Sequence, residues 1–261
     1  MNITALFPEL LHRSPLLAWG TIIHLSGFIL TFILSLIDKR KVSGNNTWIK
    51  PMKFFSSISI YLFTLCWILF YIPNAPQWIS ITIVSTMYIE TFFISLQAAR
   101  GVNSHFNASS AFNGIVFTAM GIAITINTLA CIYILILFFT EDLKISPSYL
   151  WSIRAGLFIF ILASFEGFAM ASRNSHTVGA KDGGKGLPFV NWSREGGDLR
   201  IAHFIGLHAL QILPLAGAFI QSVPAIIIIS ILYFLLSAFL FIHALKGRPV
   251  LKLKIQNPEV I

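Results

Sequence analysis

The stretch that decides the fold is residues 225–242, AIIIISILYFLLSAFLFI, close to the end of the chain. It contains no charged side chain. A run of this kind is typical of a helix that crosses the hydrocarbon layer of a membrane, which takes about 20 apolar residues. A strand of an outer-membrane barrel would instead alternate apolar and polar residues over about ten positions. This run does not alternate, so the sequence predicts a transmembrane helix.

Six further stretches along the chain have the same character. The seven predicted spans are Leu16–Ile37, Phe54–Ile72, Trp78–Ala99, Gly114–Phe139, Tyr149–Ser172, Ile201–Ile220 and Val223–Leu245. The chain of 261 residues is 56% hydrophobic and 11% charged, with a mean hydropathy of +0.79. That leaves too few polar side chains to cover a soluble domain. The prediction is an all-α polytopic membrane protein in which residues 1–261 form one seven-helix domain in the lipid bilayer.

Basic residues distinguish the two sides of this predicted bundle. Fifteen lie in the first, third and fifth loops and the carboxyl-terminal tail, whereas the other side has Arg13 and Lys144, with Arg154 just inside the fifth span. Because cytoplasmic segments carry the excess of Lys and Arg, the amino terminus is predicted outside and the carboxyl terminus in the cytoplasm. This placement accounts for the net charge of +8, which therefore does not indicate a nucleic-acid partner.

The fifth loop is polar and rich in glycine: residues 173–200 read RNSHTVGAKDGGKGLPFVNWSREGGDLR. It lacks the GxxxxGKS/T spacing of a phosphate-binding loop and follows no predicted strand. One interpretation is a tight loop in which glycine permits unusual turns. The other is a cytoplasmic lid that receives an anionic head group through Lys181, Lys185, Arg194 and Arg200. Arg100, at the end of the third span, is predicted to bind substrate with them.

Ionisable side chains within the spans cost a few kcal/mol each to insert, so each needs a partner or a function. Counting about 1.5 Å per residue from the cytoplasmic helix ends places Glu90 roughly 12–14 Å deep and Glu166 about 9 Å deep. His208 is then roughly 10 Å deep and Gln211 about 15 Å deep. These four residues share one leaflet, and their helical phases favour the bundle interior. They are predicted to line one polar pocket beneath the loop as catalytic groups.

A structural role for the same residues is the alternative. Glu90 would then pair with Arg100, and Glu166 with Arg173 or Arg200. Histidines within one turn of a helix end, such as His203, can reach interfacial water without any further function.

Imidazole and carboxylate groups also suit zinc or iron. The predicted metal ligands are Glu90, His105, His203 and His208. His203 and His208 are five residues apart, whereas a spacing of three or four would place both on one helix face, so one helix alone does not form the site. A haem would need two axial ligands at matched depth, for which the candidates are His208 with His105, His24 or His243.

Four motifs carry a resemblance to a known group of proteins: WIKPMKF (48–54), QAARGVNSHFN (97–107), HTVGAKDGGKGLPFVNWS (176–193) and GGDLRIAHFIGLHALQILP (196–214). Over about residues 46–248 the chain resembles a family of bacterial multi-pass inner-membrane proteins to which no activity is assigned. The resemblance implies a bacterial cytoplasmic membrane and carries over no functional residue. The helix count is also similar to that of zinc hydrolases of the ceramidase and adiponectin-receptor type. Their HxxxH pair is replaced here by HxxxxH, at His203 and His208.

Three functions are consistent with these features. The first is a membrane enzyme, dependent on zinc, iron or haem, that acts on a lipid-like or redox substrate at the cytoplasmic leaflet. The second is a carrier or channel for protons or small ions that uses the same residues as a relay. The third is a scaffold or assembly protein with structural polar contacts only. A closed set of ligands would favour the enzyme, whereas polar residues continuing toward His24, Asn127 and Arg154 would favour the carrier.

Overall fold

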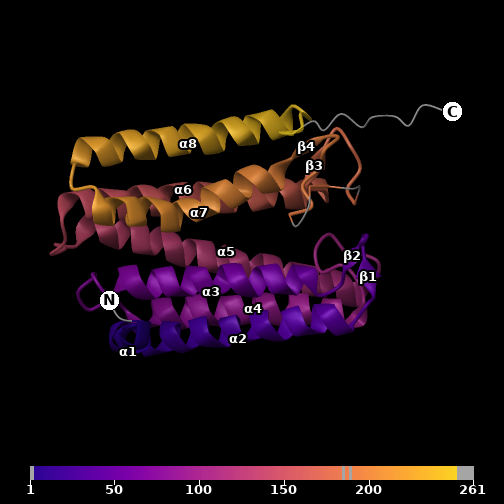
Figure 1. Cartoon of the computed structure of the whole chain (residues 1–261), viewed down its shortest axis with the longest axis horizontal. Helices are drawn as coiled ribbons and strands as arrows, with labels where there is room; N and C mark the ends of the chain where they lie inside the picture. Colours follow the sequence, from indigo (N-terminus) through magenta and orange to yellow (C-terminus); the bar gives the residue numbers. More distant parts are fainter. Residues whose placement is uncertain (1–2, 184–185, 188–189, 252–261) are drawn as a thin grey trace.

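The computed structural model describes residues 3–183, 186–187 and 190–251, and confirms the all-α class. The long helices run side by side, and two short strand pairs lie at one end of them (Figure 1). In chain order the elements are α1 (Ile3–Arg13), α2 (Pro15–Ile37), β1 (Lys41–Val42), β2 (Asn45–Asn46), α3 (Ile49–Leu69), α4 (Gln77–Arg100), α5 (Ala111–Thr140), α6 (Pro147–Arg173), β3 (Thr177–Val178), β4 (Gly197–Asp198), α7 (Leu199–Phe219) and α8 (Val223–Leu245). We call the end with both strand pairs the strand end, and the opposite end, where α1 lies, the α1 end.

Helices α2 to α8 are long and apolar enough to cross a membrane, which confirms the seven predicted spans. The bounds of α8 coincide with the prediction, and those of five other helices differ from it by at most three residues. Helix α3 is the exception, because it begins at Ile49, five residues before the predicted start. Its first turn contains Lys50, Pro51 and Lys53, and a count of apolar residues passes over these. Proline is nevertheless compatible with the first turn of a helix.

Helix α1 is an eighth helix that the apolar pattern did not predict. It is 11 residues long and lies across α2 rather than alongside it (Figure 1). Its contacts are with α2 and α3, where Leu10 is buried and the guanidinium of Arg13 lies 3.8 Å from the ring centroid of Trp67. Arg13 also binds Glu9 at 2.7 Å. A helix this short and partly polar is missed by a search for membrane-spanning runs.

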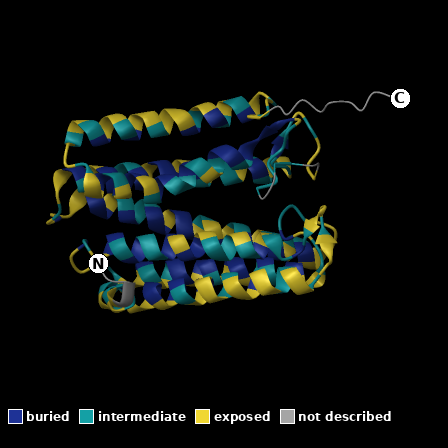
Figure 2. Cartoon of the chain, viewed as in Figure 1, coloured by how far each residue is buried: buried dark blue, intermediate teal, exposed yellow. Residues whose placement is uncertain are grey.

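The outward faces of the long helices are apolar. Ile29 on α2 is 53% exposed, and Leu232 and Phe239 on α8 are 61% and 60% exposed. Exposed positions continue along both helices (Figure 2). A soluble protein does not leave apolar surface of this extent in water. The chain is therefore an integral membrane protein whose outer faces contact lipid.

The helices pack as two halves. The first contains α2, α3 and α4, the second contains α6, α7 and α8, and α5 packs against both α4 and α6 (Figure 1). Toward the α1 end one apolar core includes both halves, with Leu62 from the first and Leu210 from the second. Toward the strand end the core is divided into separate clusters, one around Ile94 and another around Leu199. Polar side chains from the two halves can therefore face each other at the strand end.

Candidate functional site at the strand end

Glu90 and His105 form a pair in the first half. Glu90, on α4, is 6% exposed, and its Oε1 lies 3.6 Å from Nε2 of His105. The chain brings His105 back to α4 because Gly101 ends that helix in the left-handed region, at φ +72°. The imidazole packs against the rings of Phe54 and Phe117, with centroids 5.7 and 6.0 Å away. Both members of the pair were predicted as site residues, and the structure places them together.

The chemical state of the pair suits proton transfer. Burial lowers the pKa of His105 well below 6.5, and the positive charge of Lys50 lowers it further, so the imidazole is neutral at pH 7. Oε2 of Glu90 is buried and has no hydrogen-bond partner among the described residues. A separation of 3.6 Å exceeds a hydrogen bond, but catalytic contacts commonly shorten when a ligand binds. A neutral imidazole beside a carboxyl group can exchange a proton with it.

The charge of Lys50 acts on titratable groups of both halves. Lys50 occupies the first turn of α3 and is exposed. In the first half it interacts electrostatically with Glu90 and His105. In the second half it interacts in the same way with Arg200 and His176. The charge of Lys50 therefore favours the neutral form of His105 in one half and of His176 in the other.

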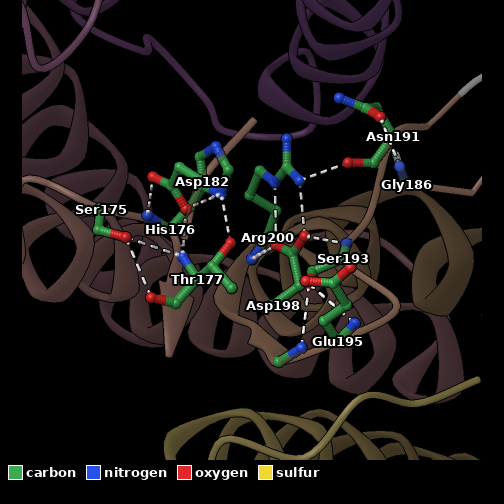
Figure 3. Close-up of polar contacts among 11 residues, drawn as sticks. Ser175, His176, Thr177, Asp182, Gly186, Asn191, Ser193, Glu195, Asp198 and Arg200 are labelled. Atoms are coloured by element: carbon green, nitrogen blue, oxygen red, sulfur yellow. Dashed lines mark hydrogen bonds and ion pairs between the residues drawn. The ribbon is translucent and has the colours of Figure 1, made fainter. Parts of the chain in front are cut away.

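The loop between α6 and α7 is folded around two aspartates, as Figure 3 shows. The carboxylate of Asp182 accepts hydrogen bonds from the backbone N–H groups of His176, at 3.1 Å, and Thr177, at 2.9 Å. Strands β3 and β4 pair antiparallel and close the loop. Gly183 has a φ of +90°, a conformation that favours glycine. These contacts support the interpretation of a tight loop with unusual turns.

Asp198 is the second organising carboxylate and is 1% exposed. It accepts hydrogen bonds from the backbone N–H groups of Ser193, at 2.8 Å, and Arg200, at 3.1 Å. The guanidinium of Arg200 also reaches it, with Nε at 2.9 Å and Nη2 at 2.6 Å. Asp198 therefore caps the start of α7 and fixes the orientation of Arg200. The structural alternative, in which Arg200 pairs with Glu166, is therefore not what the structure shows.

His176 and Asp182 form a second histidine–carboxylate pair, with Nδ1 3.1 Å from Oδ1. Burial opposes ionisation of Asp182, but hydrogen bonding by Thr177 and the contact with His176 leave its pKa lowered. Burial and the charge of Arg200 lower the pKa of His176 below 6.5. Nδ1 is hydrogen-bonded to Oγ1 of Thr177 at 3.2 Å, and the nearby ionised carboxylate of Asp182 favours the tautomer with its proton on Nδ1. A histidine oriented in this way is typical of a general base.

The four cationic residues of the predicted lid are found in the loop between α6 and α7 or, for Arg200, in the first turn of α7. Lys181 and Arg194 line a cavity of about 20 Å³ together with His176 and Arg200, which is room for about one water molecule. Nε of Arg194 is buried and has no hydrogen-bond partner in the described part of the chain. Lys185 lies outside the described residues.

Arg100 serves the packing of α4 against α5. Its guanidinium donates hydrogen bonds to Gln97 at 2.5 Å and to Asn113 at 2.8 Å, and lies 4.6 Å from the ring centroid of Phe112. The structural alternative, in which Glu90 pairs with Arg100, is therefore not what the structure shows. The partner of Glu90 is His105 instead.

Glu166, His208 and Gln211 lie in the second half, and the structure does not gather them in one pocket with Glu90. Glu166 lines a cavity between α6 and α8. His208 donates its Nδ1–H to a backbone carbonyl of its own helix at 2.8 Å. Gln211 donates to Thr64 of α3 at 3.4 Å. Counting residues from a helix end gives depth but not position around the bundle, so residues of similar depth were assigned to one pocket.

The predicted metal ligands are not gathered either. His203 donates Nδ1–H to the carbonyl of Ala163 at 2.7 Å, and no hydrogen bond or ion pair joins it to Glu90 or His105 among the described residues. In the same residues no three His, Cys, Asp or Glu side chains are placed to hold a metal ion. The imidazoles considered for haem pack against separate rings: His24 against Tyr88, His105 against Phe54, His208 against Phe204 and His243 against Phe239. Each of these histidines therefore has its own aromatic neighbour in the described structure.

A polar cluster lies deeper in the first half. Oδ1 of Asn127 accepts hydrogen bonds from Tyr61 at 3.1 Å and from Thr86 at 3.4 Å. Beyond this cluster toward the α1 end the core is mostly apolar, with Phe138 fully buried, but it also contains the buried side chains of Ser148 and Ser152. Arg154, at that end, donates to the backbone carbonyl of Phe138.

Lys50, His176 and Asp182 were not among the site residues predicted from the sequence. A signal for Lys50 was present, because Pro51 marks the first turn of a helix and places Lys50 at its start. The pairing of His176 with Asp182 depends on loop turns that leave no periodic pattern.

Comparison of the chain with protein-family models, curated proteins and solved structures gives no match. Its function is therefore inferred from the geometry of the strand end.

Proposed function

We propose that this is a multi-pass protein of the bacterial cytoplasmic membrane, with its strand end in the cytoplasm and its amino terminus outside. The fifteen basic residues on one side, against Arg13 and Lys144 on the other, support this orientation. The resemblance of four motifs to a bacterial inner-membrane family supports the location.

Cysteine labelling tests this orientation. Ser43 lies in the exposed turn between β1 and β2, and Lys144 lies between α5 and α6 at the opposite end. Cys66 and Cys131 are buried, so an introduced cysteine is the group that reacts. A membrane-impermeant maleimide added to intact cells should label Lys144→Cys, and should label Ser43→Cys only after the cells are opened. The reverse pattern would overturn the orientation.

We further propose that the protein is an enzyme that carries out acid–base chemistry on an anionic, lipid-like substrate. The observations that carry this proposal are the two histidine–carboxylate pairs, one from each half, and the charge of Lys50, which acts on groups of both halves. Cationic side chains bind anionic head groups, and two proton-exchanging pairs beside them supply a base and an acid.

The roles follow from the state of each group. Nε2 of His176 takes a proton from the attacking hydroxyl or water, while Asp182 keeps the imidazole oriented. Lys50 and Arg200 hold the anionic group of the substrate. The pair of Glu90 and His105 returns a proton to the leaving group.

The lipid-like character of the substrate is inferred from the facing sides of α3 and α7. Thr64 and Gln211 contact each other across the two halves. Ile60 is one turn from Thr64 and Phe204 is two turns from Gln211, so they lie on the same facing sides. These apolar residues are 48% and 44% exposed. An acyl chain between them would place its head group beside Lys50.

A proton carrier is the second candidate. It is favoured by the polar cluster of Asn127, Tyr61 and Thr86, which lies deeper than Glu90. The mostly apolar core between this cluster and the α1 end argues against it, because few polar groups are there to carry a proton to the other side.

A turnover assay tests the enzyme. The purified protein in nanodiscs of bacterial polar lipid is followed by ³¹P NMR and by mass spectrometry of the lipids. We expect conversion of a head group by the natural protein, and a loss of about two orders of magnitude for Lys50→Met and for His176→Asn, in line with removal of a general base. Lys39→Met is the matched control, since Lys39 is also at the strand end and, among the described residues, its Nζ bonds to a carbonyl of α2 alone.

The same preparations distinguish the two candidates. In liposomes with an imposed pH gradient, the enzyme should leave the gradient unchanged. Dissipation of the gradient that is lost in Glu90→Gln, with no converted lipid, would favour the carrier and overturn the enzyme.

A further inference from the structure

A second site lies between α6 and α8, separate from the strand-end site. A cavity of about 300 Å³ is lined by residues of these two helices. Small side chains leave the space, including Ala163 and Ala169 on α6 and Ser237 and Ala238 on α8. A volume of this size is within the range of small-molecule sites.

The cavity opens toward lipid. Leu162 and Phe165 on α6 are 40% and 49% exposed, and Phe234 on α8 is 39% exposed. Glu166 lies seven residues before Arg173, where α6 ends, and therefore about 10 Å below the strand end. At this depth the wall of the cavity is within the membrane, so a ligand would enter from the bilayer.

Glu166 gives the cavity its chemistry. It is the single ionisable residue among those that line the cavity. Its Oε2 is buried and has no hydrogen-bond partner in the described part of the chain. Arg200, which the sequence suggested as a partner, is engaged by Asp198. A carboxyl group in hydrocarbon is costly unless something pairs with it, so this placement indicates a ligand that supplies the pairing.

We propose that this cavity binds a lipid-soluble amine in its cationic form, with the ammonium group paired to Glu166. Three aromatic rings line the cavity beside the carboxyl group, those of Phe165, Phe234 and Phe241. Aromatic faces attract ammonium groups, and the attraction of opposite charges is strong where water is excluded. No basic side chain lines the cavity to repel a cation. This inference is independent of the proposed enzyme function.

Three compounds with one hydrocarbon cage test the charge requirement. They are 1-aminoadamantane, 1-adamantanol and 1-adamantanecarboxylate, each titrated into the full-length protein in nanodiscs by calorimetry. We expect the amine to bind at least tenfold more tightly than the alcohol, and the carboxylate not to bind. Glu166→Gln should weaken the amine at least tenfold and leave the alcohol unchanged.

Two further variants separate the site from general effects. Ala238→Phe should fill the cavity while keeping Glu166, and so should abolish amine binding. It tests the site in the event that Glu166→Gln fails to fold. Glu90→Gln removes another buried carboxyl group and should leave amine binding unchanged. Equal binding of amine and alcohol, or unchanged amine binding in Ala238→Phe, would overturn the proposal.

Discussion

Replacing Asp198 with asparagine should open the loop between α6 and α7. The side chain keeps its shape but exchanges one carboxylate oxygen for an amide NH₂, which cannot accept a hydrogen bond from Arg200. The change removes one of the two guanidinium contacts, at 2.9 and 2.6 Å, and the charge assistance of the other. Breaking a buried ion pair in this way costs about 3–5 kcal/mol. Because Arg200 is part-exposed, we expect the lower end, about 3 kcal/mol, which is roughly a hundredfold in an opening equilibrium.

Hydrogen exchange at residue resolution measures this opening. The amide of Leu199 is the reporter, because it donates to the backbone carbonyl of His176 at 2.9 Å and not to the carboxylate. Its exchange in Asp198→Asn should be about a hundredfold faster than in the natural protein. Asp142→Asn, an exposed aspartate at the other end, is the control and should leave the rate unchanged. A change at Leu199 of less than threefold would refute the role of Asp198 as the residue that fixes this loop.

Two further predictions concern stability. Folding lowers the pKa of His105, so the unfolded chain binds more protons, and the free energy of unfolding should fall as the pH drops through about 6.5. In thermal unfolding between pH 7.5 and 5, His105→Gln should lose less stability with falling pH than the natural protein. Gly217→Ala would place its Cβ against the side chain of Ser152 and should cost about 1–3 kcal/mol. The matched change Gly114→Ala meets open space and should stabilise by about 0.5–1 kcal/mol, so equal unfolding temperatures for the two variants would contradict the packing of α6 against α7.

The helices were predictable because the apolar residues that place each one in the membrane all lie within its own stretch of sequence. A run such as residues 225–242 is apolar along its whole length, so it lies in the membrane whether its side chains face lipid or other helices. In the membrane the backbone N–H and C=O groups must bond to each other, which requires a helix. The start of α3 and the whole of α1 were missed for the same reason, since Lys50, Pro51 and the polar residues of α1 do not add to an apolar count.

The site was less predictable because it depends on position around the bundle. Depth along a helix follows from counting residues, so Glu90 and Glu166 were both assigned to one leaflet. Their helices belong to different halves, however, and Glu166 lines a cavity between α6 and α8. The contact between Glu90 and His105 depends on the chain reversal at Gly101, and that between His176 and Asp182 on loop turns.

The proposed enzyme depends on the charge of Lys50 acting on two histidine–carboxylate pairs, one in each half of the protein. The measurement that tests this effect most directly is ¹⁵N NMR titration of the histidines in the full-length protein in nanodiscs. His105 and His176 should both have pKa values below 6.5, and Lys50→Met should raise both, because it removes a positive charge that opposes protonation of each ring. Lys39→Met should raise neither. A shift at only one of the two histidines, or at neither, would contradict the account.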